Sequence, residues 1–136
     1  MKLRLLASTP AVETIIATAM LTTTSGVLPS SLFHRLSANP TRVAETVGRI
    51  EVQHGSILEH NRLDWLLEAE EREVLKIILA NRFFTVTRLS SDRWLVSANL
   101  RTVLEYQEEG DDFSGLLMAS IENLFPSAYA FGRLKK

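Results

Sequence analysis

Residues 54–68 read HGSILEHNRLDWLLE, in which a cluster of chemically active side chains runs directly into a strand pattern. Leu63, Trp65 and Leu67 recur at every second position, which predicts a strand with one buried face. Ahead of that strand, residues 54–60 place two imidazoles, a hydroxyl and a carboxylate within seven positions. The stretch therefore joins candidate chemistry to an element of the core.

The chemistry of residues 54–60 has more than one interpretation. Histidine titrates at about pH 6.5, so two histidines beside a carboxylate suit proton transfer, metal binding or phosphate binding. If the segment is helical, Ser56, Glu59 and His60 share a face, because residues three and four apart are neighbours on a helix. Alternatively, Gly55 ends a helix and His54 bonds its last carbonyls. A metal site on His54, Glu59 and His60 is a further hypothesis, although we assign no metal.

The composition is that of one globular domain. The chain has 136 residues, of which 46% are hydrophobic, so it can bury a single core, and we expect one domain over residues 1–136. The formal net charge of −1 argues against nucleic acid as a partner, so any anion site has to be local. The absence of cysteine excludes disulfides, thiolate catalysis and cysteine-ligated metal centres.

Membrane association is not expected. No stretch approaches the roughly 20 apolar residues of a spanning helix. The basic start, residues 1–6, resembles a secretory signal only briefly, because Ser8, Thr9 and Pro10 interrupt its apolar run. We therefore expect a soluble, cytoplasmic protein.

The chain before residue 54 predicts a strand and three helices. Residues 2–5 alternate as a strand does, and Thr9-Pro10 then starts a helix, with threonine as cap and proline at the first helical position. Pro29 opens a second helix that carries His34 on its surface, and Asn39-Pro40 starts a third. The expected core residues are Val12, Ile15, Ile16, Ala19 and Met20 in the first helix and Val43, Val47 and Ile50 in the third.

The chain after residue 61 predicts more strands and helices. A strand at residues 62–68 leads into Glu70–Glu73, which suits a helix start because acidic groups favour the positive end of the helix dipole. Residues 74–79 are apolar nearly all round, so we expect this helix to be central and buried. Residues 83–88 and 94–98 predict two further strands, joined by a short hairpin.

Two last helices complete an expected α/β (α+β) fold, with a small, mostly antiparallel sheet packed by helices. Asn99 caps the first, and the second runs from Phe113 to Pro126. The acidic residues 108–112 are interpreted as a solvated turn rather than a cation site. The hydroxyl-rich residues 22–26 are interpreted as a capped helix end, with a polar ligand site as the alternative.

Four segments, in this order, resemble the flavin-dependent thymidylate synthase family, ThyX. Residues 5–10, LLASTP, with Ile15–Ala17 are similar to the family's opening strand and first helix. Residues 54–60 are similar to its His-x-Ser/Thr-x-x-Glu-His segment, which is the most recognisable of the four. Asn99–Arg101 resembles an Asn-x-Arg helix start, and Leu124–Tyr129 a closing segment that contains proline. The similarity is collinear over the whole chain.

The resemblance implies an α/β fold and a homotetramer that binds FAD and dUMP where subunits meet. It also implies a reaction, in which a methylene group from methylenetetrahydrofolate is transferred to dUMP and reduced by hydride from NADPH, carried by the flavin. The residues that it assigns to FAD are His54, Ser56, Asn81, Arg82, Asn99 and Arg101, and those that it assigns to the nucleotide substrate are Ser25, Ser91 and Arg93.

The chain departs from the family at several positions. The Arg-His-Arg signature falls on Ala80–Arg82, so one arginine and the histidine are missing, while Ser-x-Arg-Tyr falls on Ser91–Trp94. The family's His-Gln pair falls on Lys76-Ile77, its substrate arginine on Gly110, and a glutamine on Leu116. Each lost charge-assisted hydrogen bond removes about 1.5–3 kcal/mol of binding. We therefore expect thymidylate synthesis to be reduced, altered or lost.

An alternative hypothesis is a non-catalytic oligomeric scaffold or partner subunit that keeps the fold. Its basis is that Ile77 and Leu116 are apolar where the family has polar residues. Apolar side chains suit a packed interface better than a hydrated site.

Overall fold

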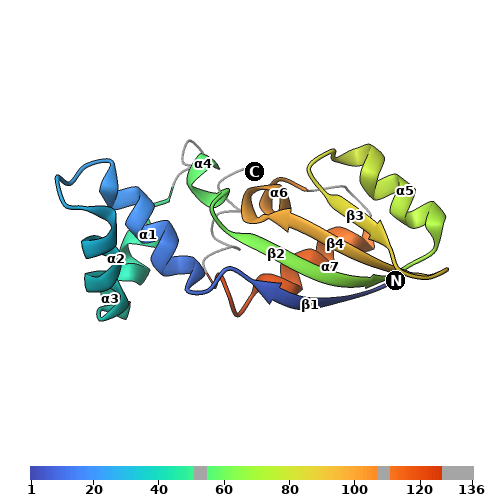
Figure 1. Cartoon of the computed structure of the whole chain (residues 1–136), viewed down its shortest axis with the longest axis horizontal. Helices are drawn as coiled ribbons and strands as arrows, with labels where there is room; N and C mark the ends of the chain where they lie inside the picture. The colour runs from blue at the N-terminus through green and yellow to red at the C-terminus, as the bar shows by residue number, and fades with distance from the viewer. Residues whose placement is uncertain (51–54, 107–110, 127–136) are drawn as a thin grey trace.

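The structure is a computed structural model, which describes residues 1–50, 55–106 and 111–126 (Figure 1). His54 lies outside the described residues, as do the family positions at Gly110 and Ser127–Tyr129. The elements are β1 (Lys2–Ser8), α1 (Val12–Thr22), α2 (Pro29–Ser37), α3 (Pro40–Val47), α4 (Gly55–Leu58), β2 (Arg62–Glu68), α5 (Glu71–Ala80), β3 (Thr85–Arg88), β4 (Arg93–Asn99), α6 (Leu100–Glu105) and α7 (Asp112–Ile121). The predicted α+β fold is confirmed.

The four strands form one antiparallel sheet in the order β1-β2-β4-β3. Trp65 stands at its centre, with Leu5 opposite on β1 and Val96 opposite on β4. Both central strands bury every second residue, which confirms the strands expected at residues 62–68 and 94–98. The hairpin between β3 and β4 is also confirmed.

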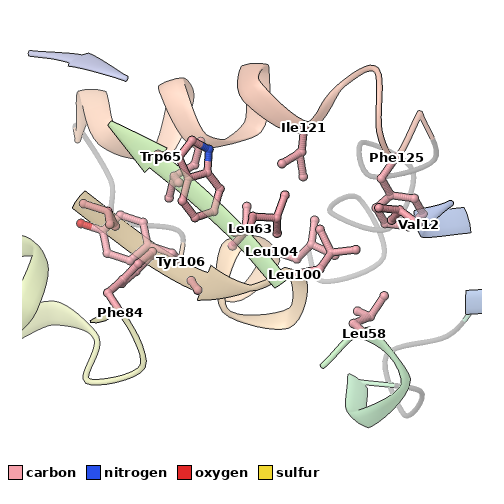
Figure 2. Close-up of a cluster of buried hydrophobic side chains, with 14 of the residues drawn as sticks. Val12, Leu58, Leu63, Trp65, Phe84, Leu100, Leu104, Tyr106, Ile121 and Phe125 are labelled. Carbon is pink, nitrogen blue, oxygen red and sulfur yellow. The ribbon is translucent and has the colours of Figure 1, made fainter. Parts of the chain in front are cut away.

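The main core lies between the sheet and the last two helices. Figure 2 shows side chains from β2, α6 and α7 meeting there, and Trp65, Leu104 and Ile121 are each at most 1% exposed. The indole N–H of Trp65 donates to Ser120 Oγ at 2.9 Å, so the largest buried side chain is also hydrogen-bonded. The rings of Phe84, Tyr106 and Phe113 meet edge to face at centroid distances of 5.4–5.6 Å.

Three helices, α1, α2 and α3, pack against one another at the other end of the molecule (Figure 1). Leu36 and Val47 are buried with Ile16 in this group. Asn39 caps α3 as predicted, because its Oδ1 accepts from the Arg42 N–H at 3.1 Å. The short helix α4 contacts both α1 and α6, and so connects this helical group to the sheet half.

The predicted helix start at Thr9-Pro10 is wrong by two residues. α1 begins at Val12, and Ala11 before it adopts φ 52°, in the left-handed region. Thr9 instead extends the pairing between β1 and β2: its N–H donates to the Arg62 carbonyl, and its Oγ1 accepts from the Arg62 N–H, both at 2.9 Å. Thr9 therefore pairs with the backbone at the start of β2 and does not cap the helix, as its local sequence had predicted.

The expectation that α5 is central and buried is also wrong. Its buried side chains are Val74 and Ile77, whereas Leu75, Ile78 and Leu79 are 53%, 42% and 78% exposed. The helix lies at the edge of the molecule, beside β3 (Figure 1). A helix that is apolar all round needs neighbours on both sides, and the described part of the chain supplies them on one side only.

Two smaller predictions are corrected as well. The last helix was expected to reach Pro126, but α7 ends at Ile121. Most of the acidic run lies outside the described residues, and its end is not a solvated turn. Asp111 caps α7, because its Oδ1 accepts from the Phe113 N–H at 2.9 Å, and it also accepts from the Tyr106 hydroxyl.

None of the helices described is long and apolar enough to cross a bilayer.

Candidate functional site

The segment singled out by sequence forms α4 and the turn after it. Gly55 begins this helix, so the alternative in which it ends one is wrong. A Cβ at Gly55 would lie 3.1 Å from Arg101 Nε, so the missing side chain makes room for the guanidinium. The glycine therefore serves the close approach of Arg101 to α4.

Arg101 of α6 pairs with two carboxylates, that of Glu59 in the turn after α4 and that of Glu105 within α6 itself. Its Nη1 donates to Glu59 Oε1 at 2.6 Å, and its Nε donates to Glu105 Oε1 at 2.9 Å. The hydrogen bond to Glu105, followed by that to Glu59, raises the pKa of Arg101 above its ordinary value. The guanidinium is therefore committed to two carboxylates of its own chain, although the resemblance assigns it to FAD.

A pocket of about 640 Å³ lies between α1, α2 and α4, and we call it the α4 pocket. Its size falls within the roughly 300–1,000 Å³ of small-molecule sites. Its walls are mostly apolar, and its polar groups come from α1 with the residue after it and from α4 with the turn after it, while α2 contributes only apolar side chains. The lining residues are Ile15, Thr18, Ala19, Thr22, Thr23, Pro29, Phe33, Ser56, Ile57 and His60.

The polar groups of the α4 pocket are of two kinds. The threonine hydroxyls donate to helix carbonyls, those of Thr18 and Thr22 at 2.7 Å and that of Thr23 at 2.8 Å, which leaves their oxygens as acceptors. Ser56 and His60 have exposed side chains at the same pocket and bring a hydroxyl and an imidazole. Ser56 lies in α4 and His60 in the turn after it, and both line the pocket, whereas Glu59, predicted to share their face, pairs with Arg101.

The hydroxyl-rich residues after α1 fit both of their interpretations. The hydroxyls of Thr22, Thr23 and Thr24 cap the helix end by bonding its carbonyls. Thr22 and Thr23 also line the α4 pocket. Ser25, assigned to substrate by the resemblance, accepts from the Val27 N–H at 3.3 Å and is not among the lining residues.

The other residues assigned to FAD lie at the end of the sheet where β4 meets α6. Asn99 caps α6 as predicted: its Oδ1 accepts from the Thr102 N–H at 2.8 Å and from the Thr102 hydroxyl at 3.0 Å. Asn81 follows α5, and its Oδ1 accepts from the Phe83 N–H at 2.8 Å. Arg82 is exposed, with its guanidinium carbon 5.0 Å from the centroid of the Phe83 ring.

Two of the three residues assigned to the nucleotide, Ser91 and Arg93, lie at the opposite end of β4. Ser91 is in the hairpin turn, and Arg93 begins the strand that ends at Asn99, so about six residue steps, roughly 20 Å, separate the two groups. Arg93 borders a separate pocket of about 460 Å³ with Lys2 and Arg4. A single chain therefore brings Ser56 and Arg101 together around α4, but leaves Ser91 and Arg93 apart from them.

A residue that sequence reasoning missed lies next to α4. Asn61 is fully buried, and neither its side-chain oxygen nor its nitrogen has a hydrogen-bond partner in the described part of the chain. Its backbone is paired, since its N–H donates to the Leu58 carbonyl and its carbonyl accepts from the Leu100 N–H. No sequence signal distinguishes this asparagine from an ordinary turn residue.

The sequence matches no known family model and no curated protein. The site is therefore interpreted from its own residues and from the resemblance. Within residues 1–50, 55–106 and 111–126, no group of three His, Asp or Glu side chains is placed to hold a metal ion. The metal hypothesis also requires His54, which lies outside those ranges, so it stays untested.

Proposed function

We propose that the protein is a divergent homologue of the flavin-dependent thymidylate synthases that binds a flavin or a nucleotide in the α4 pocket. The observation that carries the proposal is the pocket itself, in which apolar walls meet the hydroxyl of Ser56 and the imidazole of His60. A heteroaromatic ring needs apolar surfaces for its faces and hydrogen-bonding groups for its edges. Phe33 and Ile57 supply the first, and Ser56 and His60 supply the second.

The residues present fit the ring of a flavin better than its diphosphate. Arg101 lies against α4 at Gly55, and Glu59 and Glu105 already engage it. Arg82 follows α5, and it does not line the α4 pocket. Under the proposal, cations for the diphosphate come from a neighbouring subunit, in keeping with a homo-oligomer, favoured as a tetramer, whose sites form where subunits meet.

A bound flavin would supply hydride transfer, and the residues of this chain would hold and orient it. We propose that methyl transfer from methylenetetrahydrofolate to dUMP, with NADPH as reductant, is reduced or lost. The support is the sequence: Ala80 and Asn81 stand where the family signature has arginine and histidine. Ile77, in place of a polar residue, is 2% exposed, so its side chain packs inside its own chain and contacts neither a ligand nor the subunit interface of the alternative hypothesis.

The test is the absorption and fluorescence of the purified protein during titration with FAD. We expect bound flavin in the wild type, with affinity about five-fold weaker in Ser56→Ala because one hydrogen bond of about 1 kcal/mol is lost. Ser31→Ala is the matched control, since Ser31 is exposed on α2 and does not line the pocket. Equal affinity of both variants, or no binding at saturating FAD, would rule out the α4 pocket.

A second candidate function is a non-catalytic oligomeric scaffold or partner subunit. The observation that favours it is the exposed apolar surface of α5, which a working flavin pocket does not require. The same titration separates the two, because a scaffold assembles without retaining flavin. Size measured in the same run gives the assembly state.

A further inference from the structure

Helix α5 presents an apolar face that the described part of the chain leaves uncovered. Leu75, Ile78 and Leu79 are spaced three and four apart, so they are neighbours on the helix surface. They are 53%, 42% and 78% exposed, and Phe83, just past the end of the helix, is 57% exposed. We call these four residues the α5 face.

The size of the α5 face points to a protein partner. The four side chains present on the order of 400 Å² of apolar surface, within the roughly 300–600 Å² of the largest patch on a typical monomer, which is often functional. A standard interface buries about 800 Å² on each partner, so the face supplies about half of one. Charged residues flank it, as in interfaces with an apolar centre and a polar rim.

The charges along α5 identify the partner as a second copy. Glu70, Glu71 and Glu73 lie at its start and outnumber Arg72 there, whereas Lys76 lies at mid-helix and Arg82 just beyond the helix end. Two such helices side by side in antiparallel orientation place the acidic end of each beside the basic end of the other. The macrodipoles of the two helices then also oppose each other favourably.

We infer that two copies of this chain pack through their α5 faces, antiparallel, about a twofold axis. The contact is isologous, so the same face serves both copies. Leu75 and Ile78 lie near its centre, and Glu71 of each copy lies beside Arg82 of the other. Glu71 already pairs with Arg88 at 3.3 Å in an exposed ion pair, and such a carboxylate has a second oxygen to offer. The pairing does not depend on what the α4 pocket binds.

The first test is the mass in solution, measured by light scattering after size exclusion from about 1 µM to about 200 µM protein. We expect the wild type to be a dimer or a larger even assembly, and Leu79→Glu to halve its mass. Leu28→Glu is the matched control, since Leu28 is 70% exposed at the start of α2. A wild type that stays monomeric throughout, or equal effects of the two variants, would overturn the inference.

The second test uses charge reversal to determine whether the two α5 helices are antiparallel. In Glu71→Arg, the new arginine lies beside Arg82 of the other copy, and in Arg82→Glu, the new glutamate lies beside Glu71. Each variant therefore places like charges together and should associate at least ten-fold more weakly than the wild type. A mixture of the two restores both opposite-charge contacts and should recover the wild-type mass. Circular dichroism of each variant confirms that it is folded. Failure of the mixture to associate better than either variant alone would exclude the antiparallel arrangement.

Discussion

Asn61 has a polar side chain in surroundings that offer it no hydrogen bond within the described ranges. Its amide is fully buried without a partner in the described ranges, which costs about 1–3 kcal/mol relative to hydration. We predict that Asn61→Leu, of similar shape, raises the free energy of unfolding by about 1 kcal/mol and the melting temperature by about 3 °C. Thermal unfolding followed by circular dichroism measures both.

Asn99 provides the matched control. Asn99→Leu removes the cap of α6 and should lower the unfolding free energy by about 1 kcal/mol. The same substitution is therefore expected to have opposite signs at two asparagines. A lower melting temperature for Asn61→Leu would show that its amide is hydrogen-bonded, and would place a partner or a buried water beside it.

Residue-level predictions from sequence succeeded where the cause was local. Asn39 and Asn99 were identified as caps because a cap bonds the N–H three residues later, within the same segment. For Gly55, sequence left a helix and a helix end as alternatives, because the close approach that it serves depends on Arg101, a partner distant in sequence. The missing polar partner of Asn61 likewise depends on packing that no local pattern records.

At the scale of elements, Arg101 links α6 to the turn after α4 through Glu59 and also pairs with Glu105 within α6. Its two ion pairs are partly exposed, and each contributes about 0.2–1 kcal/mol. We predict that Arg101→Gln lowers the unfolding free energy in urea by about 1 kcal/mol, and that 1 M salt removes most of this loss. The raised pKa of Arg101 means that its stabilisation is fully present below the unfolded pKa and lost only as pH rises through the folded one, so it should be constant near neutral pH.

A double-mutant cycle tests whether Gly55 serves this contact. In the wild type, Gly55→Ala brings a Cβ within 3.1 Å of Arg101 Nε, which offsets the usual gain of replacing a helical glycine by alanine. In an Arg101→Gln background that restraint is relaxed, so Gly55→Ala should become stabilising by roughly 0.5–1 kcal/mol. Additive effects of the two substitutions would mean that the close approach has no energetic consequence.

Sequence predicted most strands and helices but not that apolar side chains of α5 are exposed. Alternation fixed β2 and β4, because a strand buries every second residue whatever else surrounds it. Apolar residues around α5 predicted burial, which is correct only when the chain itself covers both sides. The same pattern arises when a second molecule covers one side, and a single sequence does not distinguish these cases.

At the scale of the whole molecule, the candidate site lies where the helical group of α1, α2 and α3 meets the sheet half. The hydroxyl-rich end of α1 indicated a ligand site only as an alternative, and α2 carries no motif for the pocket, which is why sequence located Ser56 but not Phe33. A ligand in the α4 pocket contacts all three helices at once. Its binding free energy is therefore added to the stability of this junction rather than to the sheet.

This arrangement predicts where a ligand protects the protein. At 100 times its dissociation constant, FAD should stabilise the bound state by about 2.7 kcal/mol. Hydrogen exchange should then slow in α1, α2 and α4, while β2 and β4, already buried between α7 and neighbouring strands, change little. Mass spectrometry of peptides from these elements measures the pattern. Protection centred on residues 91–93 instead would place the ligand at the opposite end of β4, beside Lys2, Arg4 and Arg93, and would transfer the proposed function to that pocket.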